Sequence, residues 1–164
     1  MIKQLSILIL TMFHLGDSKY APGTAASFVT CLVYIWFYNL QIEIFFLIIG
    51  VSLIFIFSVY SIDNFKGSFS KIDAKEIVID EFIGQSIPVL SIYSFIEKNN
   101  LGHFILYTFV SFVLFRIFDI WKPYPINKID GKMKNGLGVI LDDVIAGIYS
   151  IILLLIFIFF VNYD

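Results

Sequence analysis

The sequence predicts an all-α, polytopic membrane bundle with about five membrane helices and a short N-terminal helix, forming a single domain over residues 1–164. Hydrophobic residues make up 59% of the chain and charged residues only 15%, against roughly 45–50% and about 25% in ordinary soluble domains. A soluble domain of this size leaves too much surface wet to hide so many apolar side chains. Long charge-free stretches and a one-sided distribution of Lys and Arg indicate the same class.

The N-terminal segment is expected to form an uncleaved helix. Lys3 followed by the apolar residues 5–13 loosely imitates a signal peptide, but no small-x-small cleavage site follows. We therefore predict a short helix that lies at the membrane interface or packs on the bundle.

Five apolar stretches are expected to form the membrane helices: Ala25–Gln41, Ile44–Ile62, Phe82–Ile96, His103–Phe118 and Val144–Val161. Crossing about 30 Å of hydrocarbon takes about 20 helical residues, which Ile44–Ile62 supplies comfortably. The third stretch is short and contains Pro88, which is expected to kink it. Backbone in lipid must satisfy its own hydrogen bonds, and the alternation of a β-barrel is absent, so helices are predicted.

The orientation of the bundle follows from the distribution of basic residues. Threading five helices places ten of the 11 Lys and Arg residues on one side and only Lys98 on the other. The positive-inside rule makes the basic side cytoplasmic. The long loops marked by Gly and Pro lie on that side, so we expect the functional residues there.

The first of these loops, residues 16–24, leads into the first membrane helix. Pro22-Gly23 predicts a turn, and Thr24 is a plausible N-cap for the helix. A helix N-terminus with the hydroxyls of Thr24 and Ser27 can receive a phosphate. A capped turn without a ligand is the alternative interpretation.

The second polar segment leads into the third membrane helix. Asp73 with Glu76 three residues later is a capping-box pattern, which predicts that a helix starts there. Asp80 and Gly84 then share one stripe with Glu76, and Glu81 lies beside it. Glu76 suits a solvated first turn, but acids at a membrane entrance are costly unless they are paired or bind a cation.

The third segment ends the fourth membrane helix. Arg116, Asp119 and Lys122 recur every three residues and can lie on roughly one side of the helix, which Pro123 ends. An ion pair between Arg116 and Asp119 with no further role is the structural alternative.

The fourth segment is a flexible basic glycine loop, with Lys134, that runs into Asp142 and Asp143 at the mouth of the fifth helix. Small residues follow that permit close helix packing: Ala146, Gly147 and Ser150. That packing is expected to bring the paired aspartates near the other acids.

Together the four segments predict a cluster of carboxylates beside cations on the cytoplasmic face. Carboxylate oxygens suit Mg²⁺, a hard cation that is completed by water and substrate phosphate. Arg and Lys suit a phosphate dianion. The residues by themselves therefore predict a metal-plus-phosphate site at the inner leaflet.

These same segments resemble the phosphatidylglycerophosphatase A family of bacterial membrane phosphatases. The matching pieces run in order along nearly the whole chain: Ala21–Thr24, Ile77–Gly84, Phe115–Ile126 and Gly138–Gly147. His14–Tyr20 and Asn135 depart from the usual family pattern. The resemblance implies an all-α bundle in the bacterial inner membrane, and Mg²⁺-dependent removal of the terminal phosphate of phosphatidylglycerophosphate, giving phosphatidylglycerol.

The residues and the resemblance together suggest roles for the side chains. Mg²⁺ is expected to be held by Asp80, Glu81, Asp142 and Asp143, with Asp119 as a further catalytic acid. The groups expected to bind the phosphate are Arg116, Lys122, Lys134 and Thr24. A metal-activated water and an aspartyl-phosphate intermediate both stay open. The expected partners are the phospholipid substrate and membrane lipid, with no nucleic acid, because the net charge is only −2.

Two other functions are considered. Asp130-Gly131 and the spacing from Gly138 to Asp142 echo part of the CDP-alcohol phosphotransferase motif, but its Ala-Arg pair and last aspartate are missing. A small membrane transporter would want acids near the bilayer midplane, whereas here they gather at one end of the bundle.

Overall fold

The computed structural model describes residues 2–65, 74–97 and 99–163 and confirms the all-α fold class. Within these ranges the chain forms seven α-helices, one 3-10 turn and no strand. In chain order the elements are α1 (Ile2–Leu10), η1 (Leu15–Asp17), α2 (Pro22–Asn39), α3 (Ile44–Phe65), α4 (Ile79–Phe95), α5 (Leu101–Trp121), α6 (Ile126–Lys132) and α7 (Gly136–Tyr163).

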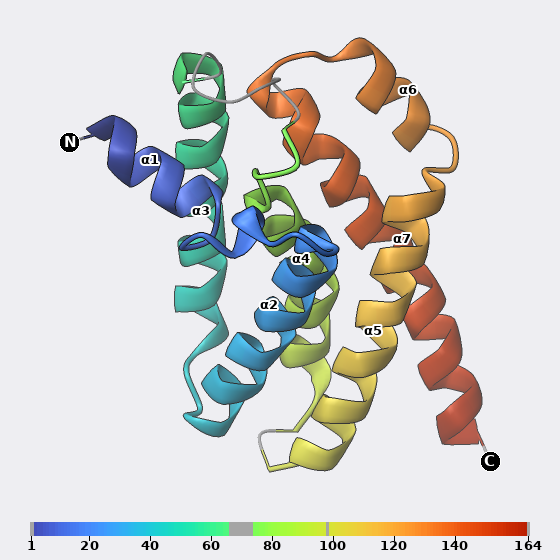
Figure 1. The fold of residues 1–164 in the computed structure, drawn as a ribbon. Helices are drawn as coiled ribbons and strands as arrows, with labels where there is room; N and C mark the ends of the chain where they lie inside the picture. The colour runs from blue at the N-terminus through green and yellow to red at the C-terminus, as the bar shows by residue number, and fades with distance from the viewer. Residues whose placement is uncertain (1, 66–73, 98, 164) are drawn as a thin grey trace.

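The five long helices α2, α3, α4, α5 and α7 run alternately between the two ends of the bundle (Figure 1), as their apolar stretches predict. The predicted short N-terminal helix is α1, which packs on α3. At the end where α4 and α7 begin, α6 links α5 to α7 (Figure 1). This short helix was not predicted, because the segment between the fourth and fifth apolar stretches has the composition of a loop.

Three helices of the described chain are long and apolar enough to cross a membrane: α3, α5 and residues 136–160 of α7. In α3 only 17% of the most apolar window is buried inside the protein. Large apolar side chains such as Phe45, Leu53 and Ile56 are exposed on it. Water would penalise such a surface heavily, so the chain is a membrane protein. α2 and α4 are helical where expected but carry more polar residues.

α4 occupies the centre of the bundle and contacts α2, α3, α5 and α7. At the end away from its start, aromatic rings hold α2 to α5, where Tyr38 stacks on Phe104 with ring centroids 4.1 Å apart. At the other end, Leu10, Ile62 and Ile140 belong to one buried apolar cluster that joins α1, α3 and α7. α4 is thus held at both ends by packed side chains.

The crossing of α4 and α7 is a backbone-to-backbone contact. A Cβ on Gly147 would lie 2.4 Å from the Gly84 carbonyl oxygen, and a Cβ on Gly84 would lie 2.7 Å from the Asp143 carbonyl oxygen. Pro88 lies inside α4 and has no N–H, so it leaves the Gly84 carbonyl without its usual helical donor. That carbonyl faces Gly147. The close helix packing predicted at Gly147 is thereby confirmed.

The start of α2 differs from the prediction. Pro22 and Gly23 are the first helical residues and Thr24 lies in the first turn, so the predicted turn and the Thr24 N-cap were wrong. The N-cap is Ala21, in the left-handed region at φ 43°. Proline is favoured at the first helical position because its φ is preset and its missing N–H is not needed there.

The start of α4 also differs from the prediction. α4 begins at Ile79, so Glu76 lies in the preceding turn and not on the helix. Asp73, the other half of the predicted capping box, lies outside the described residues. The turn is stabilised by tertiary contacts instead, because the Val78 amide donates to the Leu10 carbonyl at 3.0 Å.

α7 begins at Gly136, well before the predicted Val144. The Asn135 side chain accepts a hydrogen bond from the Gly138 amide at 2.9 Å, and the Gly136 amide donates to Asp63 at 2.8 Å. These contacts satisfy amides that a helix start leaves open. Asp142 and Asp143 therefore lie inside the helix. The prediction that they lie at its mouth was wrong.

A first prediction concerns the crossing of α4 and α7. Gly147→Ala is expected to destabilise the protein by about 1–3 kcal/mol, because its Cβ would meet a rigid carbonyl oxygen. The matched control is Gly50→Ala in α3, where a Cβ meets nothing within 4 Å. Thermal unfolding in detergent measures both variants. Equal unfolding temperatures would show that the contact does not limit stability.

Candidate functional site

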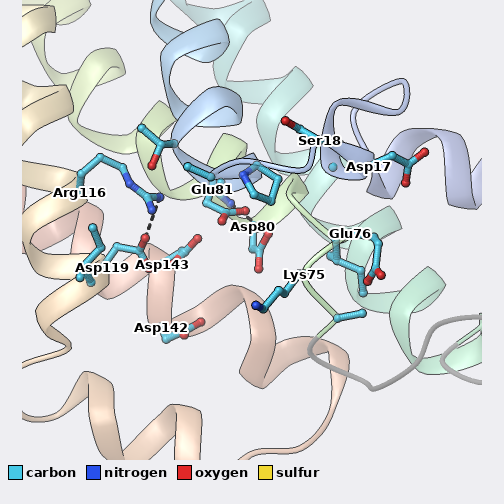
Figure 2. A pocket seen from close by; sticks show the side chains of 18 of the residues that line it. Asp17, Ser18, Lys75, Glu76, Asp80, Glu81, Arg116, Asp119, Asp142 and Asp143 are labelled. Atoms are coloured by element: carbon cyan, nitrogen blue, oxygen red, sulfur yellow. Dashed lines mark hydrogen bonds and ion pairs between the residues drawn. The ribbon is translucent and has the colours of Figure 1, made fainter.

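A cavity of about 670 Å³ opens at the end of the bundle where α4 and α7 begin and α5 ends (Figure 2). Its wall combines five parts of the chain: η1 with the loop after it, the start of α2, the turn before α4 with the first turn of α4, the end of α5, and α7. The charged residues among its lining are Asp17, Lys19, Lys75, Glu76, Asp80, Glu81, Arg116, Asp119, Lys122, Asp142 and Asp143.

Three carboxylates converge in this cavity. Asp80 and Glu81 stand in the first turn of α4, and Asp143 comes from α7. One oxygen from each of the three lies within 4.8 Å of the others. Asp80 is 8% exposed and Asp143 is 4% exposed, so water screens their mutual repulsion poorly. Three carboxylate oxygens at this spacing could together hold a metal ion.

The buried oxygens of the cluster support this interpretation. Glu81 Oε2 is buried and makes no hydrogen bond. The Asp80 carboxylate accepts from the Glu81 amide at 3.2 Å. A buried carboxylate oxygen without a donor costs free energy that a bound cation would recover. The donor set consists of oxygen atoms alone, which fits a hard divalent ion.

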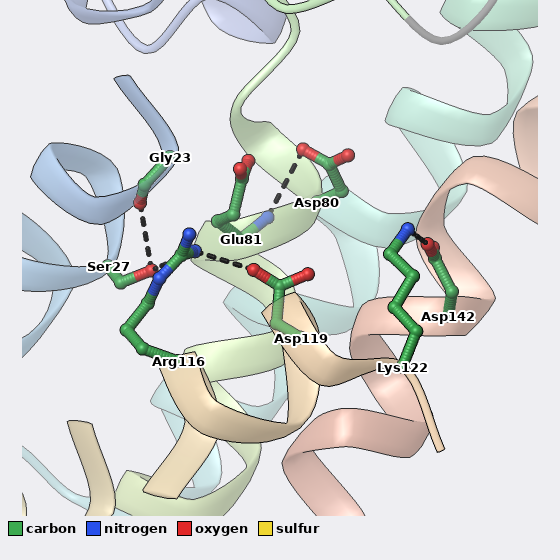
Figure 3. Close-up of polar contacts among 8 residues, drawn as sticks. All are labelled: Gly23, Ser27, Asp80, Glu81, Arg116, Asp119, Lys122 and Asp142. Carbon is green, nitrogen blue, oxygen red and sulfur yellow. Dashed lines mark hydrogen bonds and ion pairs between the residues drawn. The ribbon is translucent and has the colours of Figure 1, made fainter. Parts of the chain in front are cut away.

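Asp142 is adjacent to Asp143 but has a different partner. Its Oδ2 lies 2.6 Å from Lys122 Nζ (Figure 3). Lys122 follows the last residue of α5 in the left-handed region, at φ 46°, and reaches from there to α7. The predicted metal ligand Asp142 therefore lies in the same cavity, joined to the predicted phosphate-binding Lys122.

Arg116 and Asp119 form an ion pair with 2.7 Å between Arg116 NH1 and Asp119 Oδ2. The same NH1 donates to Ser27 Oγ at 3.4 Å, and Ser27 donates to the Gly23 carbonyl at 2.9 Å (Figure 3). Arg116 Nε is buried and makes no hydrogen bond. The guanidinium is thus held against α2 at the wall of the cavity, where its positive charge suits an anion.

The start of α2 closes over Glu81. A Cβ on Gly23 would lie 1.9 Å from Glu81 Oε1 and 3.4 Å from Arg116 NH1. Only glycine leaves room there for the carboxylate and the guanidinium together. Pro22-Gly23 predicts only a turn from the sequence, so this steric role of Gly23 was not predicted.

The predicted phosphate-binding residues divide into two groups. Arg116, Lys122 and Thr24 line the cavity. Lys134 is exposed in the segment before α7 and is not part of the lining. Conversely, Lys75 lines the cavity although no sequence pattern pointed to it as a site residue. Its side chain is exposed in a turn whose neighbouring residues Ala74 and Ile77 are buried, and sequence spacing could not place that turn at the cavity.

The family model of phosphatidylglycerophosphatase A matches residues 8–158 of this chain. The chain belongs to the phosphatidylglycerophosphatase A family. The resemblance seen in four sequence segments is thereby confirmed, and so is the class of enzyme, a phosphoric monoester hydrolase. No solved structure is significantly similar to the chain.

Three curated relatives cover most of the chain. Phosphatidylglycerophosphatase A of Haemophilus influenzae is 35% identical over 88% of this chain and 83% of its own. Phosphatidylglycerophosphatase A of Escherichia coli is 29% identical over 87% and 77%. A Bacteroides thetaiotaomicron protein named "Putative phosphatidylinositol-3-phosphatase" is 34% identical over 92% and 91%. These names agree on a phosphatase and differ in the lipid headgroup.

A second prediction follows from the fit of Gly23. Gly23→Ala is expected to lower phosphatase kcat by about 10–100-fold, because it displaces the Glu81 carboxylate, and small misplacements cost this much. Its stability should change little, since the group displaced is the end of a side chain. Gly102→Ala, where a Cβ meets nothing within 4 Å, is the control for both measurements. Unchanged kcat in Gly23→Ala would remove Glu81 from the reacting centre.

Proposed function

We propose that this protein hydrolyses phosphatidylglycerophosphate to phosphatidylglycerol and phosphate, with Mg²⁺, at the cytoplasmic face of the bacterial inner membrane. The observation that carries the proposal is the convergence of Asp80, Glu81 and Asp143 within 4.8 Å, in a cavity that Arg116 and Lys122 also line. Carboxylates that gather beside cations suit a phosphate group bound together with a divalent ion.

Asp80, Glu81 and Asp143 would hold the Mg²⁺, with Asp142 as a further ligand. When bound, Mg²⁺ neutralises phosphate charge and activates water. Arg116 then neutralises phosphoryl oxygens with the donors that its pair with Asp119 leaves over. Lys122, just after the end of the same helix, does the same while it holds Asp142. Thr24 offers a hydroxyl at the cavity wall, and Lys134 would have to reach in from the segment before α7.

The proposed orientation rests on the charge distribution. The site end of the bundle bears Lys19, Lys75, Arg116, Lys122 and Lys128, all outside the apolar middle of the helices. The positive-inside rule places such an end in the cytoplasm. α2 and α4 would then cross the bilayer beside α3, α5 and α7, giving the five membrane helices that the sequence predicts.

The proposed substrate follows the family name and the names of two relatives. The Bacteroides relative supplies a rival, phosphatidylinositol 3-phosphate. Both lipids carry a phosphomonoester at the end of a headgroup and a phosphodiester next to the glycerol backbone. The metal and the cations would act on the monoester in either lipid.

A third prediction tests the carboxylates. Asp80→Asn and Asp142→Asn are each expected to lower phosphate release by about 100-fold or more, because each removes charge from the proposed metal site. Both variants should still fold and enter the membrane, since the amide keeps the shape of the side chain. Glu43→Gln, exposed in the turn between α2 and α3, is the matched control. Full activity in either aspartate variant would remove that residue from the site.

A fourth prediction concerns the metal and the substrate together. Phosphate release from phosphatidylglycerophosphate in mixed micelles should stop with EDTA and return with added Mg²⁺. The same assay with phosphatidylinositol 3-phosphate should show a lower kcat/KM. Activity that survives complete metal removal contradicts the metal proposal, and a higher kcat/KM for the inositol lipid contradicts the substrate proposal.

A further inference from the structure

Four basic side chains line the cavity, and they fall into two classes. Arg116 and Lys122 are paired with acids of the site, Asp119 and Asp142. Lys75 and Lys19 line the same cavity, yet no carboxylate in the described chain forms an ion pair with either. Both side chains are exposed, so their ammonium groups can meet an anion that enters the cavity.

The turn that carries Lys75 is held in place on several sides. Its neighbours Ala74 and Val78 are buried, at 3% and 0% exposed. The Val78 amide donates to the Leu10 carbonyl at 3.0 Å, which fixes the turn to the end of α1. A Cβ on Gly16 would lie 1.9 Å from the Glu76 carbonyl oxygen, so η1 packs directly on this backbone. Lys75 is therefore a lysine on a fixed backbone, not one on a free loop.

The direction of the Lys75 side chain matches this placement. Figure 2 shows its ammonium group extending from the turn before α4 into the cavity, whereas Arg116 reaches in from α5. Between them lie the converging acids Asp80 and Asp143. Lys19 joins the wall from the loop after η1, three residues beyond the Gly16 contact, and lies over the Tyr20 ring with 5.9 Å to the centroid. On one wall of the cavity, the cations Arg116 and Lys122 thus pair with acids. On another wall, Lys75 and Lys19 have no ion-pair partner among the described residues.

A lipid phosphomonoester of the proposed kind carries two anionic groups. The terminal monoester belongs at the metal and at Arg116 and Lys122. The phosphodiester remains, with a single negative charge next to the glycerol backbone. We propose that Lys75, assisted by Lys19, forms a second anion subsite that binds this phosphodiester and so selects phospholipid substrates over small phosphomonoesters. The inference rests on the proposed lipid phosphatase function.

The chemistry of lysine suits this task. A lysine ammonium is a compact point charge with three donors, and it needs no fixed bidentate geometry. A phosphodiester next to a mobile glycerol backbone presents its oxygens in varied directions. The planar guanidinium of Arg116 binds in a more fixed geometry and suits the monoester. Asp119 and Ser27 hold it in place there.

The test compares Lys75→Gln with the unchanged protein on two probes of the same cavity. The KM for phosphatidylglycerophosphate in mixed micelles of fixed lipid fraction is expected to rise about tenfold with kcat little changed, as for loss of one charge-assisted hydrogen bond. The inhibition constant of inorganic phosphate, which as product binds at the monoester end, should not change. Lys75→Arg should restore most of the affinity.

Lys128→Gln is the control, because Lys128 is exposed over the Tyr124 ring and is not part of the cavity lining. The KM of Lys128→Gln shows how much of any change comes from weaker attraction between the protein surface and the micelle. Lys19→Gln should raise the same KM by a smaller factor, so a folding failure of one variant leaves the other to decide.

An unchanged KM in both lysine variants would overturn the proposal. A parallel rise in the inhibition constant of phosphate would overturn it too, because Lys75 would then act on the monoester. Failure of the proposed function is a separate result, seen when the unchanged protein releases no phosphate from this lipid.

Discussion

The close crossing of α4 and α7 is the constraint on which the site depends. Gly84 and Gly147 let the two backbones touch, and Pro88 leaves the Gly84 carbonyl free to face the neighbouring helix. Asp80 stands one helical turn before Gly84, and Asp143 stands one turn before Gly147. Because both helices run in the same direction (Figure 1), the same step along each helix brings the two carboxylates together. The geometry of the candidate site is thus set by two residues that have no side chain.

The carboxylates that the proposed function needs also lower the stability of the bundle. Buried carboxylates that crowd together repel each other, and the surrounding helices provide few donors to the Glu81 carboxylate. The aromatic packing at the far end of the bundle, with Tyr38 on Phe104, and the apolar cluster around Ile62 and Ile140 stabilise the bundle against this repulsion. Cation binding would relieve the repulsion directly, which links occupancy of the site to the stability of the bundle.

Patterns of composition and spacing predicted the helices, because lipid requires long apolar helical runs whatever the partners are. They also predicted which acids and cations share an end of the bundle. The starts of helices were less predictable. Thr24 and Glu76 look like capping residues locally, but Pro22 and the Val78–Leu10 hydrogen bond decide where α2 and α4 begin. Asp63 likewise helps to set the start of α7 through a contact between distant segments, whereas Asn135 caps the helix locally by accepting from the Gly138 amide. The role of Gly23 depends on a side chain far along the sequence, and no local pattern could show it.

The hydrogen bond from the Val78 amide to the Leu10 carbonyl has a practical consequence. It makes α1 and η1 part of the enzyme's architecture, since these two elements support the wall from which Lys75 projects. An affinity tag or a fusion partner before α1 would act directly on this support, and removing α1 would loosen the wall. The opposite terminus lies at the far end of the bundle (Figure 1), so a tag placed there stays away from the cavity.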